Sequence, residues 1–179
     1  MGRWTIQTYE TVFSAPPWVR VDRERVAVPE GPVIDDFYRV VLPPFAMVVP
    51  FTREGRVVLV RGYRHGPRRV CLSVPAGMLD VGETPLAAAQ RELREETGYE
   101  AAAWEGFGQF VSDGNRECAT AHLFVARGAR RVAAPTPDPT ERFTVAELTR
   151  DEVLGAMRTG EVATLATAAA LGLALSLGV

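Results

Sequence analysis

The sequence predicts an α/β or α+β sandwich preceded by a small antiparallel β-sheet. Short β-like runs are mixed with helical segments, and no regular βαβ alternation is visible. Residues 1–45 alternate apolar and polar side chains in short runs, and the pairs Pro16-Pro17 and Pro43-Pro44 punctuate them. We therefore expect a β-sheet subdomain at residues 1–45 and a second domain at residues 46–179.

Local patterns place the individual elements in order along the chain. A hairpin is expected around Arg53-Glu54-Gly55, because apolar runs flank this turn on both sides. Residues 133–140 hold three prolines and should form a loop. The expected strands are residues 18–22, 37–42, 45–50, 56–60, 70–74, 106–111, 121–126 and 143–145. The expected helices are residues 84–97, residues 149–157 and a C-terminal helix within residues 162–179, packed on the core.

The composition is that of a globular protein and argues against nucleic-acid binding and a membrane span. The 179 residues are 47% hydrophobic and 23% charged, which is typical of a globular chain long enough to bury a core. A net charge of -2 gives no support for nucleic-acid binding. Residues 162–179 carry no charge, but alanine, glycine and threonine dominate them, so we expect no membrane span. The first 15 residues lack the apolar run of a signal peptide, and we expect a cytoplasmic protein.

The segment at residues 84–97 has the signals of a helix at both ends. Thr84 is a plausible N-cap, Pro85 suits the first helical position, and Gly98 stands where a left-handed C-cap would fall. At 100° per residue, one side of this helix presents Leu86, Ala89 and Leu93, which we expect to pack into the core.

Another face of the same helix gathers three carboxylates, Glu92, Glu95 and Glu96. Arg91 lies one turn before Glu95 and can pair with it. Oxygen ligands of high charge density suit Mg²⁺ or Mn²⁺ rather than zinc, and Mg²⁺ is usually bound together with substrate phosphates. The competing interpretation is a glutamate-rich helix face that is simply solvated.

The spacing of the whole segment resembles the signature of the Nudix hydrolases. That signature runs from a glycine through a glutamate to Arg-Glu, an aliphatic residue, Glu-Glu, a glycine and an apolar residue. The matching residues are Gly77, Glu83, Arg91, Glu92, Leu93, Glu95, Glu96, Gly98 and Tyr99. With average residue usage, a chance match in this chain is on the order of 10⁻⁷.

The resemblance implies an αβα sandwich with a mixed sheet and hydrolysis of a pyrophosphate bond with Mg²⁺ or Mn²⁺. It implies that Glu92, Glu95 and Glu96, with the carbonyl of Ala76, hold the metal. It further implies that Arg91 orients the carboxylates and that Glu83 supports the cluster. In related enzymes a glutamate of a late loop activates the water. Glu141 is the only glutamate of the matching loop, and Asp138 is the alternative.

The approach to this segment is similar to the ADP-ribose or nucleoside diphosphate-sugar pyrophosphatase branch of the family. There the equivalent of Arg64 contacts substrate, and Gly77 and Ser112 also match positions of the substrate site. The branch usually carries Ser-Pro-Gly after the signature, whereas this chain has Ser112-Asp113-Gly114. In that branch the N-terminal sheet forms a dimer, so a homodimer is implied, with a small-molecule nucleotide as the substrate.

Two other functions stay open at this stage. One is a non-catalytic nucleotide-sugar sensor on the same fold, although sensors of that kind tend to lose glutamates that are all present here. The other is a Nudix hydrolase that acts on another nucleotide or on an RNA cap, for which the low net charge gives no support.

Overall fold

The computed structural model describes residues 2–136, 138 and 140–176. The described chain forms two compact units. The first unit comprises Met1–Pro44 with Phe110–Ala121, and the second comprises Phe45–Gln109 with His122–Val179. The first unit therefore adds a later segment to the N-terminal region that the sequence indicated. A functional boundary after residue 45 stays a prediction.

The first unit is built on an antiparallel sheet of β1 (Thr5–Ala15), β2 (Val19–Ala27) and β3 (Val33–Val41). This confirms the small antiparallel sheet, although the sequence patterns had indicated only the parts that became β2 and β3. Asp22 of β2 is buried, and its carboxylate accepts hydrogen bonds from Thr11 and Arg20. In contrast, side chains of β1 are exposed along almost its whole length.

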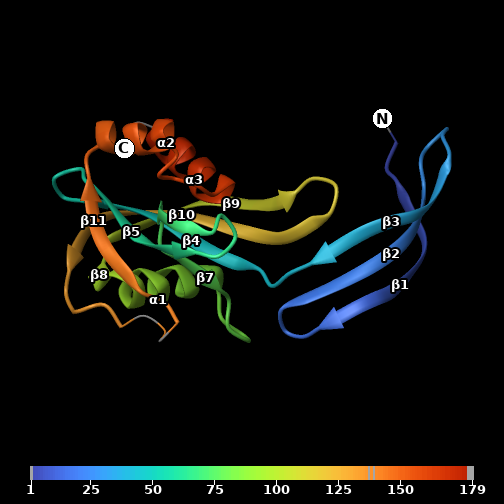
Figure 1. Cartoon of the computed structure of the whole chain (residues 1–179), viewed down its shortest axis with the longest axis horizontal. Coiled ribbons are helices and arrows are strands. Elements are labelled where there is room, and N and C mark those ends of the chain that lie inside the picture. Colours follow the sequence, from blue (N-terminus) through green and yellow to red (C-terminus); the bar gives the residue numbers. More distant parts are fainter. Residues whose placement is uncertain (1, 137, 139, 177–179) are drawn as a thin grey trace. The chain divides into compact units, whose positions relative to one another are not determined.

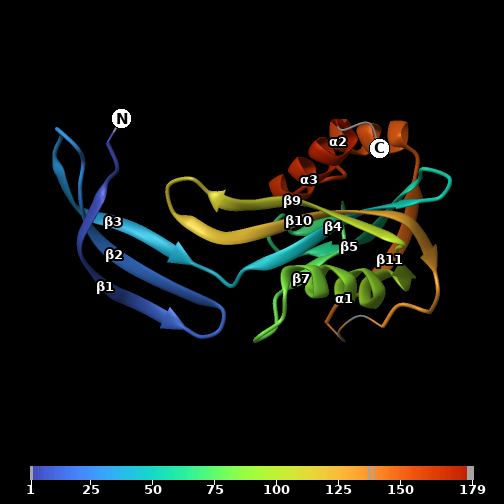
Figure 2. The ribbon, with the colours of Figure 1, turned by 180° about the vertical axis from the view of Figure 1, so that it is seen from behind.

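The second unit is a sandwich around a sheet in which β10, β4, β5 and β11 are neighbours in that order. Figures 1 and 2 show α1 on one face of this sheet and α2 and α3 on the other, which confirms the αβα sandwich. The smaller strands β6 and β7 pair with β5 and β4, and β8 and β9 pair with β10. The strands are β4 (Phe45–Thr52), β5 (Val57–Arg64), β6 (Arg69–Ser73), β7 (Ala76–Met78), β8 (Tyr99–Glu100), β9 (Ala103–Asp113), β10 (Glu117–Arg131) and β11 (Phe143–Leu148). The helices are α1 (Pro85–Thr97), α2 (Arg150–Thr159) and α3 (Leu165–Ser176).

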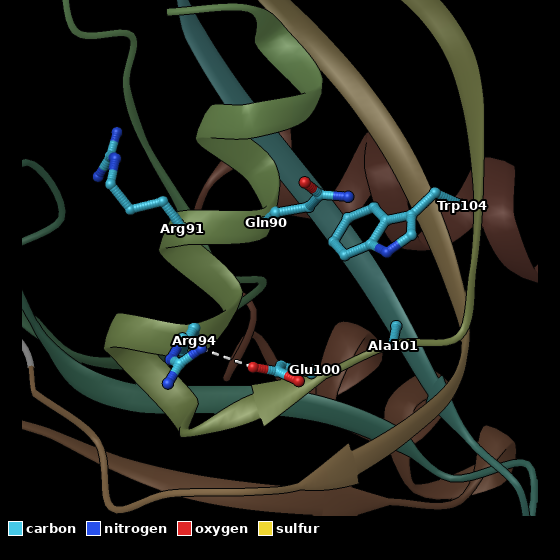
Figure 3. Close-up of a pocket in the computed structure, with 6 residues that line it drawn as sticks. All are labelled: Gln90, Arg91, Arg94, Glu100, Ala101 and Trp104. Carbon is cyan, nitrogen blue, oxygen red and sulfur yellow. Dashed lines mark hydrogen bonds and ion pairs between the residues drawn. The ribbon is translucent and has the colours of Figure 1, made fainter.

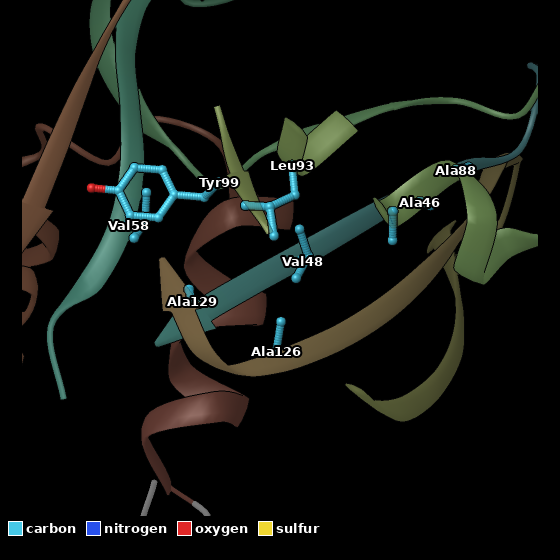
Figure 4. Close-up of a cluster of buried hydrophobic side chains, with 9 residues drawn as sticks. Ala46, Val48, Val58, Ala88, Leu93, Tyr99, Ala126 and Ala129 are labelled. Atoms are coloured by element: carbon cyan, nitrogen blue, oxygen red, sulfur yellow. The ribbon is translucent and has the colours of Figure 1, made fainter. Parts of the chain in front are cut away.

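The core between α1 and the sheet consists of small and aliphatic side chains. Its buried members are Ala46, Val48, Val58, Ala88, Ala89, Leu93, Tyr99, Ala126 and Ala129. Figure 4 shows Leu93 pointing at the strands, and it shows the Tyr99 hydroxyl directed away from the aliphatic side chains. That hydroxyl donates a hydrogen bond to Glu147 of β11, so the polar end of a buried ring is satisfied. The small residues allow α1 to lie close to the sheet.

Local sequence signals determine where α1 begins and ends. The Thr84 side chain accepts a hydrogen bond from the Ala87 N–H, Pro85 occupies the first turn, and Gly98 closes the helix at φ 74°. The expected helix is therefore confirmed to within one residue at its start. One expectation about its faces was wrong: Leu86, which was expected in the core, is 38% exposed. Glu96, in contrast, is only 1% exposed. The helix is rotated so that part of its acidic face is buried.

The start of α2 also follows from the local sequence. The Thr149 side chain accepts from the Glu152 N–H, and the Glu152 carboxylate accepts from the Thr149 N–H, which is a capping box at the start of α2. The C-terminal helix expected from the sequence is α3, which contacts β4. Within the part of the chain that the structure describes, no helix is both long and apolar enough to span a membrane.

Candidate active site

Arg91 connects three of the carboxylates that the sequence indicated. Its Nε and Nη2 atoms both donate to the Glu83 carboxylate at 3.0 Å, and its Nη1 donates to Glu92 at 2.6 Å and to Glu95 at 3.3 Å. A further bond from Nη2 reaches the Met78 carbonyl at 3.0 Å. The hydrogen bonds to Arg91 hold the pKa of Glu83 below its usual value. One planar guanidinium thereby fixes the relative positions of three acidic side chains.

Glu96 stands apart from this network and is deeply buried. Its Oε2 accepts a hydrogen bond from the Ala76 N–H at 3.2 Å, but its Oε1 has no hydrogen-bond partner. Burial raises the pKa of Glu96 to about 8, and the nearby charges of Glu92 and Glu141 act in the same direction. A buried carboxylate oxygen without a partner is costly, so this atom is the point of the site that most needs a cation.

Glu92 occupies a space that only glycine at position 77 leaves free. A Cβ atom added at Gly77 would lie 1.9 Å from Glu92 Oε1. Gly77 is part of β7, which pairs with β4 through Ala46. Burial raises the pKa of Glu92, while its bond to Arg91 opposes that shift. The strand that carries Ala76 and Gly77 is therefore packed directly on the acidic face of α1.

Arg64 approaches the same cluster from β5. Its Nη2 lies 3.7 Å from Glu96 Oε1, which is an ion pair beyond hydrogen-bonding distance. The guanidinium carbon lies 4.6 Å from the centre of the Phe143 ring. Among the described residues, Arg64 is thus the cation that forms an ion pair with the unpartnered oxygen.

The loop that carries Glu141 is attached to the end of α1. The N–H groups of Val132 and Ala133 donate to the Gly98 carbonyl, and the Thr136 N–H donates to the Glu95 carbonyl at 2.8 Å. A Cβ atom at Gly98 would lie 2.2 Å from the Ala133 carbonyl oxygen, so a larger residue would displace the loop. The negative charge of Glu141 is close enough to raise the pKa of Glu92 and Glu96.

Two of the expected residues, Ser112 and Asp138, are exposed. Ser112 lies in the first unit at an exposed position of β9, and its role in substrate binding stays a prediction. Asp138 is exposed, and its carbonyl accepts a hydrogen bond from the Glu141 N–H. Gly77, Ala76, Arg64 and Glu141, in contrast, are all brought to the acidic face of α1 in the second unit.

Asp113, which stands where the ADP-ribose branch usually has proline, has a structural role in the β9–β10 turn. Its Oδ1 accepts hydrogen bonds from the N–H groups of Asn115 at 2.8 Å and Arg116 at 2.6 Å. These backbone hydrogen bonds lower the pKa of the Asp113 carboxyl. An aspartate that caps a turn explains the departure without an interaction with substrate.

Carboxylate oxygens are suitable ligands for a divalent cation, but the described side chains do not point at one common metal position. Among the described residues, no group of three or more His, Cys, Asp or Glu side chains is arranged to hold a metal ion. Arg91 engages Glu92 and Glu95, so these side chains would have to exchange a guanidinium contact for a metal contact. The unpartnered Glu96 Oε1 is the observation that fits a cation here.

A hollow of about 360 Å³ beside α1 borders the cluster at Arg91, but none of the clustered carboxylates lines it. Figure 3 shows Gln90 and Trp104 at its edge, Arg94 paired with Glu100, and the Arg91 side chain directed away from Trp104. The Arg94 side chain is 61% exposed. The acidic residues on the Arg91 side, and not this hollow, form the candidate active site.

Phe143 is the residue of this site that the sequence patterns did not identify as functional. Sequence analysis placed it only in a strand, and its contact with Arg64 joins positions far apart in the chain. No local pattern in the sequence points to this contact, because it depends on the pairing of β5 with β11, in which Phe143 lies opposite Gly62.

The fold and the acidic helix define a class: an αβα sandwich suited to hydrolysis of phosphate anhydrides with a divalent cation. The NUDIX domain family matches residues 42–166, which is more than half of the chain. The protein therefore belongs to the Nudix family and is a pyrophosphohydrolase, and Nudix hydrolases generally use divalent metal ions.

Similar proteins agree with this assignment. The methanol dehydrogenase activator of Bacillus methanolicus is 35% identical over 84% of this chain and 80% of its own length. An ADP-ribose pyrophosphatase of Bacillus subtilis is 31% identical over 72% of this chain and 70% of its own length. One from Mycobacterium tuberculosis is 34% identical over 63% of this chain and 55% of its own length. A crystal structure of an ADP compounds hydrolase has a TM-score of 0.81, covers 99% of this chain and 95% of its own, and at 20% identity supports the fold.

The burial of Glu96 predicts a pH dependence of stability in protein freed of divalent ions. Its folded pKa of about 8 lies above the unfolded value of 4.5, so the folded state binds more protons between these values. The free energy of unfolding should therefore fall as pH rises from about 5 to 8, with a limiting slope of about 1.4 kcal/mol per pH unit from this group.

Chemical denaturation at several pH values, with a chelator present, measures this slope. Glu96→Gln is the comparison variant, because it removes the charge and nearly preserves the size. The variant should show a shallower slope and should be the more stable protein at pH 8. Equal slopes in the two proteins would contradict the assigned role of Glu96 burial.

Proposed function

We propose that this chain hydrolyses the pyrophosphate bond of a nucleoside diphosphate sugar, with ADP-ribose as the leading substrate and Mg²⁺ or Mn²⁺ as the cofactor. The products are a nucleoside monophosphate and a sugar phosphate. The observation that carries the proposal is the buried Glu96 with an unpartnered oxygen, next to carboxylates that a single arginine holds in place. The names of the two ADP-ribose pyrophosphatase relatives support the choice of substrate.

The residues that would hold the ion are Glu92, Glu95 and Glu96, with the Ala76 carbonyl. A bound divalent ion would neutralise the diphosphate and lower the pKa of a coordinated water. The two hydrogen bonds from Arg91 to Glu83 could persist if Glu92 and Glu95 turned towards the ion. Glu83 would therefore keep the guanidinium in place.

Glu141 is the proposed general base. Its charge already acts on Glu92 and Glu96, and its loop is attached to α1 at Glu95 and Gly98. In the reaction, a water oxygen attacks phosphorus, Glu141 accepts the water proton, and the bridging P–O bond breaks. Positioning and electrostatic stabilisation supply most of the rate in such phosphoryl transfers.

The first unit supports a proposal of a homodimer whose substrate sites use both chains. Large apolar side chains are exposed in it, with Tyr9 at 69% and Trp18 at 61%. The others on β1 and near it are Trp4, Ile6, Val12 and Phe13. A patch of this kind on a small sheet is typical of a protein–protein interface, and a second copy is the partner that the branch resemblance implies.

The substrate and the metal are tested together with Glu96→Gln. Wild-type protein should release AMP from ADP-ribose with Mg²⁺ or Mn²⁺ and should lose activity with a chelator. The variant should lose at least about a hundredfold in kcat, because a cation-activated water contributes several kcal/mol to the barrier.

Chromatography of the nucleotide products over a panel of nucleoside diphosphate sugars measures both effects. Glu100→Gln is the matched control, since Glu100 pairs with Arg94 outside the acidic cluster. Near-normal turnover of Glu96→Gln would show that the metal assignment is wrong. Preference for another sugar would retain the reaction and change the substrate.

The role of Glu141 is tested by Glu141→Gln. Turnover should fall by about a hundredfold or more, the usual contribution of a positioned general base. Mg²⁺ affinity, measured by calorimetry, should stay close to that of wild type. Asp138→Asn is the comparison, and unchanged turnover in Glu141→Gln would transfer the role to Asp138 or to Glu92.

The dimer is tested by sedimentation of the full chain and of a chain lacking residues 1–42. The full chain should be a dimer that buries well over about 2,000 Å². The truncated chain should be monomeric or insoluble and should lose substrate affinity.

Phe13→Asp gives a milder test of the dimer, because it places a charge on β1. Leu165→Asp is its matched control, because Leu165 is exposed on α3 of the second unit. A monomer in solution that hydrolyses ADP-ribose efficiently would contradict the shared-site part of the proposal.

A further inference from the structure

The Phe143 side chain occupies a position that depends on the absence of a side chain at residue 62. Phe143 and Gly62 are partners in the antiparallel pairing of β11 with β5. A Cβ atom at Gly62 would lie 2.2 Å from Phe143 Cδ1 and 2.7 Å from Cε1. The ring therefore lies across the backbone of β5 in direct contact with the glycine.

The same ring contacts the guanidinium of Arg64. Side chains two residues apart on a strand share a face, so Arg64 projects from β5 on the side where the ring covers Gly62. The guanidinium carbon lies 4.6 Å from the ring centre, within the range of a cation–π contact. Arg64 is 3.7 Å from Glu96 Oε1 but makes no hydrogen bond to it, so the stacked ring is the contact that can set the plane of the guanidinium.

A guanidinium stacked on a ring keeps its N–H groups available at its edge. Arginine can therefore remain stacked while it donates two hydrogen bonds to a phosphate. The edge of Arg64 already lies beside the acidic cluster, where a diphosphate would be bound. Phe143 is also two residues after Glu141, so the same short segment carries the ring and the proposed base.

We propose that Phe143 is a positioning residue for the diphosphate. Its ring, held over Gly62, keeps Arg64 oriented so that the guanidinium can pass from Glu96 to a phosphate oxygen. This inference rests on the proposed function, because it takes a diphosphate to be the group that Arg64 binds. It adds Phe143 and Gly62 to the substrate site as residues that act through Arg64.

Phe143→Leu tests the proposal, because leucine keeps apolar volume and removes the aromatic face. The KM for ADP-ribose should rise by about threefold to tenfold, the range expected from loss of a cation–π contact. The kcat should change less than KM, and Mg²⁺ affinity should stay unchanged. Phe143→Tyr retains the ring face and should restore the wild-type KM.

Two further variants separate positioning from a general loss of structure. Gly62→Ala displaces the ring without altering Phe143 or Arg64 and should raise KM in the same way. In an Arg64→Lys background, Phe143→Leu should add little, because the group that the ring positions is already gone. Arg61→Lys is the matched control on the same strand, since Arg61 pairs with Glu161 and should leave KM unchanged.

An NMR measurement without metal or substrate completes the test. The Nε–Hε signal of Arg64, assigned from Arg64→Lys, should carry a ring-current shift that Phe143→Leu removes and Phe143→Tyr retains. A wild-type KM and an unmoved Arg64 signal in Phe143→Leu would overturn the proposal. If the signal moves as expected but wild-type protein hydrolyses no nucleoside diphosphate sugar, the proposed function fails and the positioning of Arg64 by Phe143 remains.

Discussion

The site depends on one arginine that holds several carboxylates on and beside a helix packed against a sheet. Without Arg91, Glu92 and Glu95 would repel each other next to the buried Glu96. The two hydrogen bonds to Glu83 fix the guanidinium plane, and that plane then directs Glu92 and Glu95. The hydrogen bonds to Arg91 thereby offset the repulsion between the carboxylates, so α1 can pack with its acidic face partly buried.

Glycine determines how closely the backbone can approach this cluster. Gly77 leaves room for the Glu92 carboxylate, and Gly98 leaves room for the loop that leads to Glu141. Gly62 does the same for the Phe143 ring. At each of these positions a methyl group would lie at or below 2.2 Å from its neighbour, so the glycines are required by packing around the site and not only by turn geometry.

The sequence was sufficient for features that depend on residues close together in the chain. Thr84, Pro85 and Gly98 determine the ends of α1, and the spacing of Arg91 and Glu95 predicts their pairing. The expectation for Leu86 was wrong because the apolar face was assigned from helical periodicity alone. The rotation of α1 is decided by its contacts with β4 and β7, which involve residues far away in the sequence.

The difference between local and long-range interactions also separates the predicted from the unpredicted parts of the site. The acidic residues of α1 follow from one contiguous segment, whereas the contact of Arg64 with Phe143 requires the register of β5 with β11. The burial of Glu96 also depends on tertiary packing, since helical spacing places it on the same face as the more exposed Glu95. Short strands such as β7 and β8 were missed because two or three residues carry too little periodicity.

Burial of Glu96 lowers the stability of the ion-free protein when the carboxylate is ionised, and the proposed cation would offset this cost. In the absence of a cation, the carboxylate is destabilising when ionised, and its pKa rises accordingly. A solvated carboxylate would avoid that cost but would gain less from an ion, because water already stabilises its charge. A doubly charged ion would therefore stabilise the buried oxygen strongly. Arg64, at 3.7 Å and without a hydrogen bond, neutralises its charge only in part. If Glu96 holds the proposed ion, the ion would neutralise this carboxylate, and Arg64 would then be free to bind an anionic substrate.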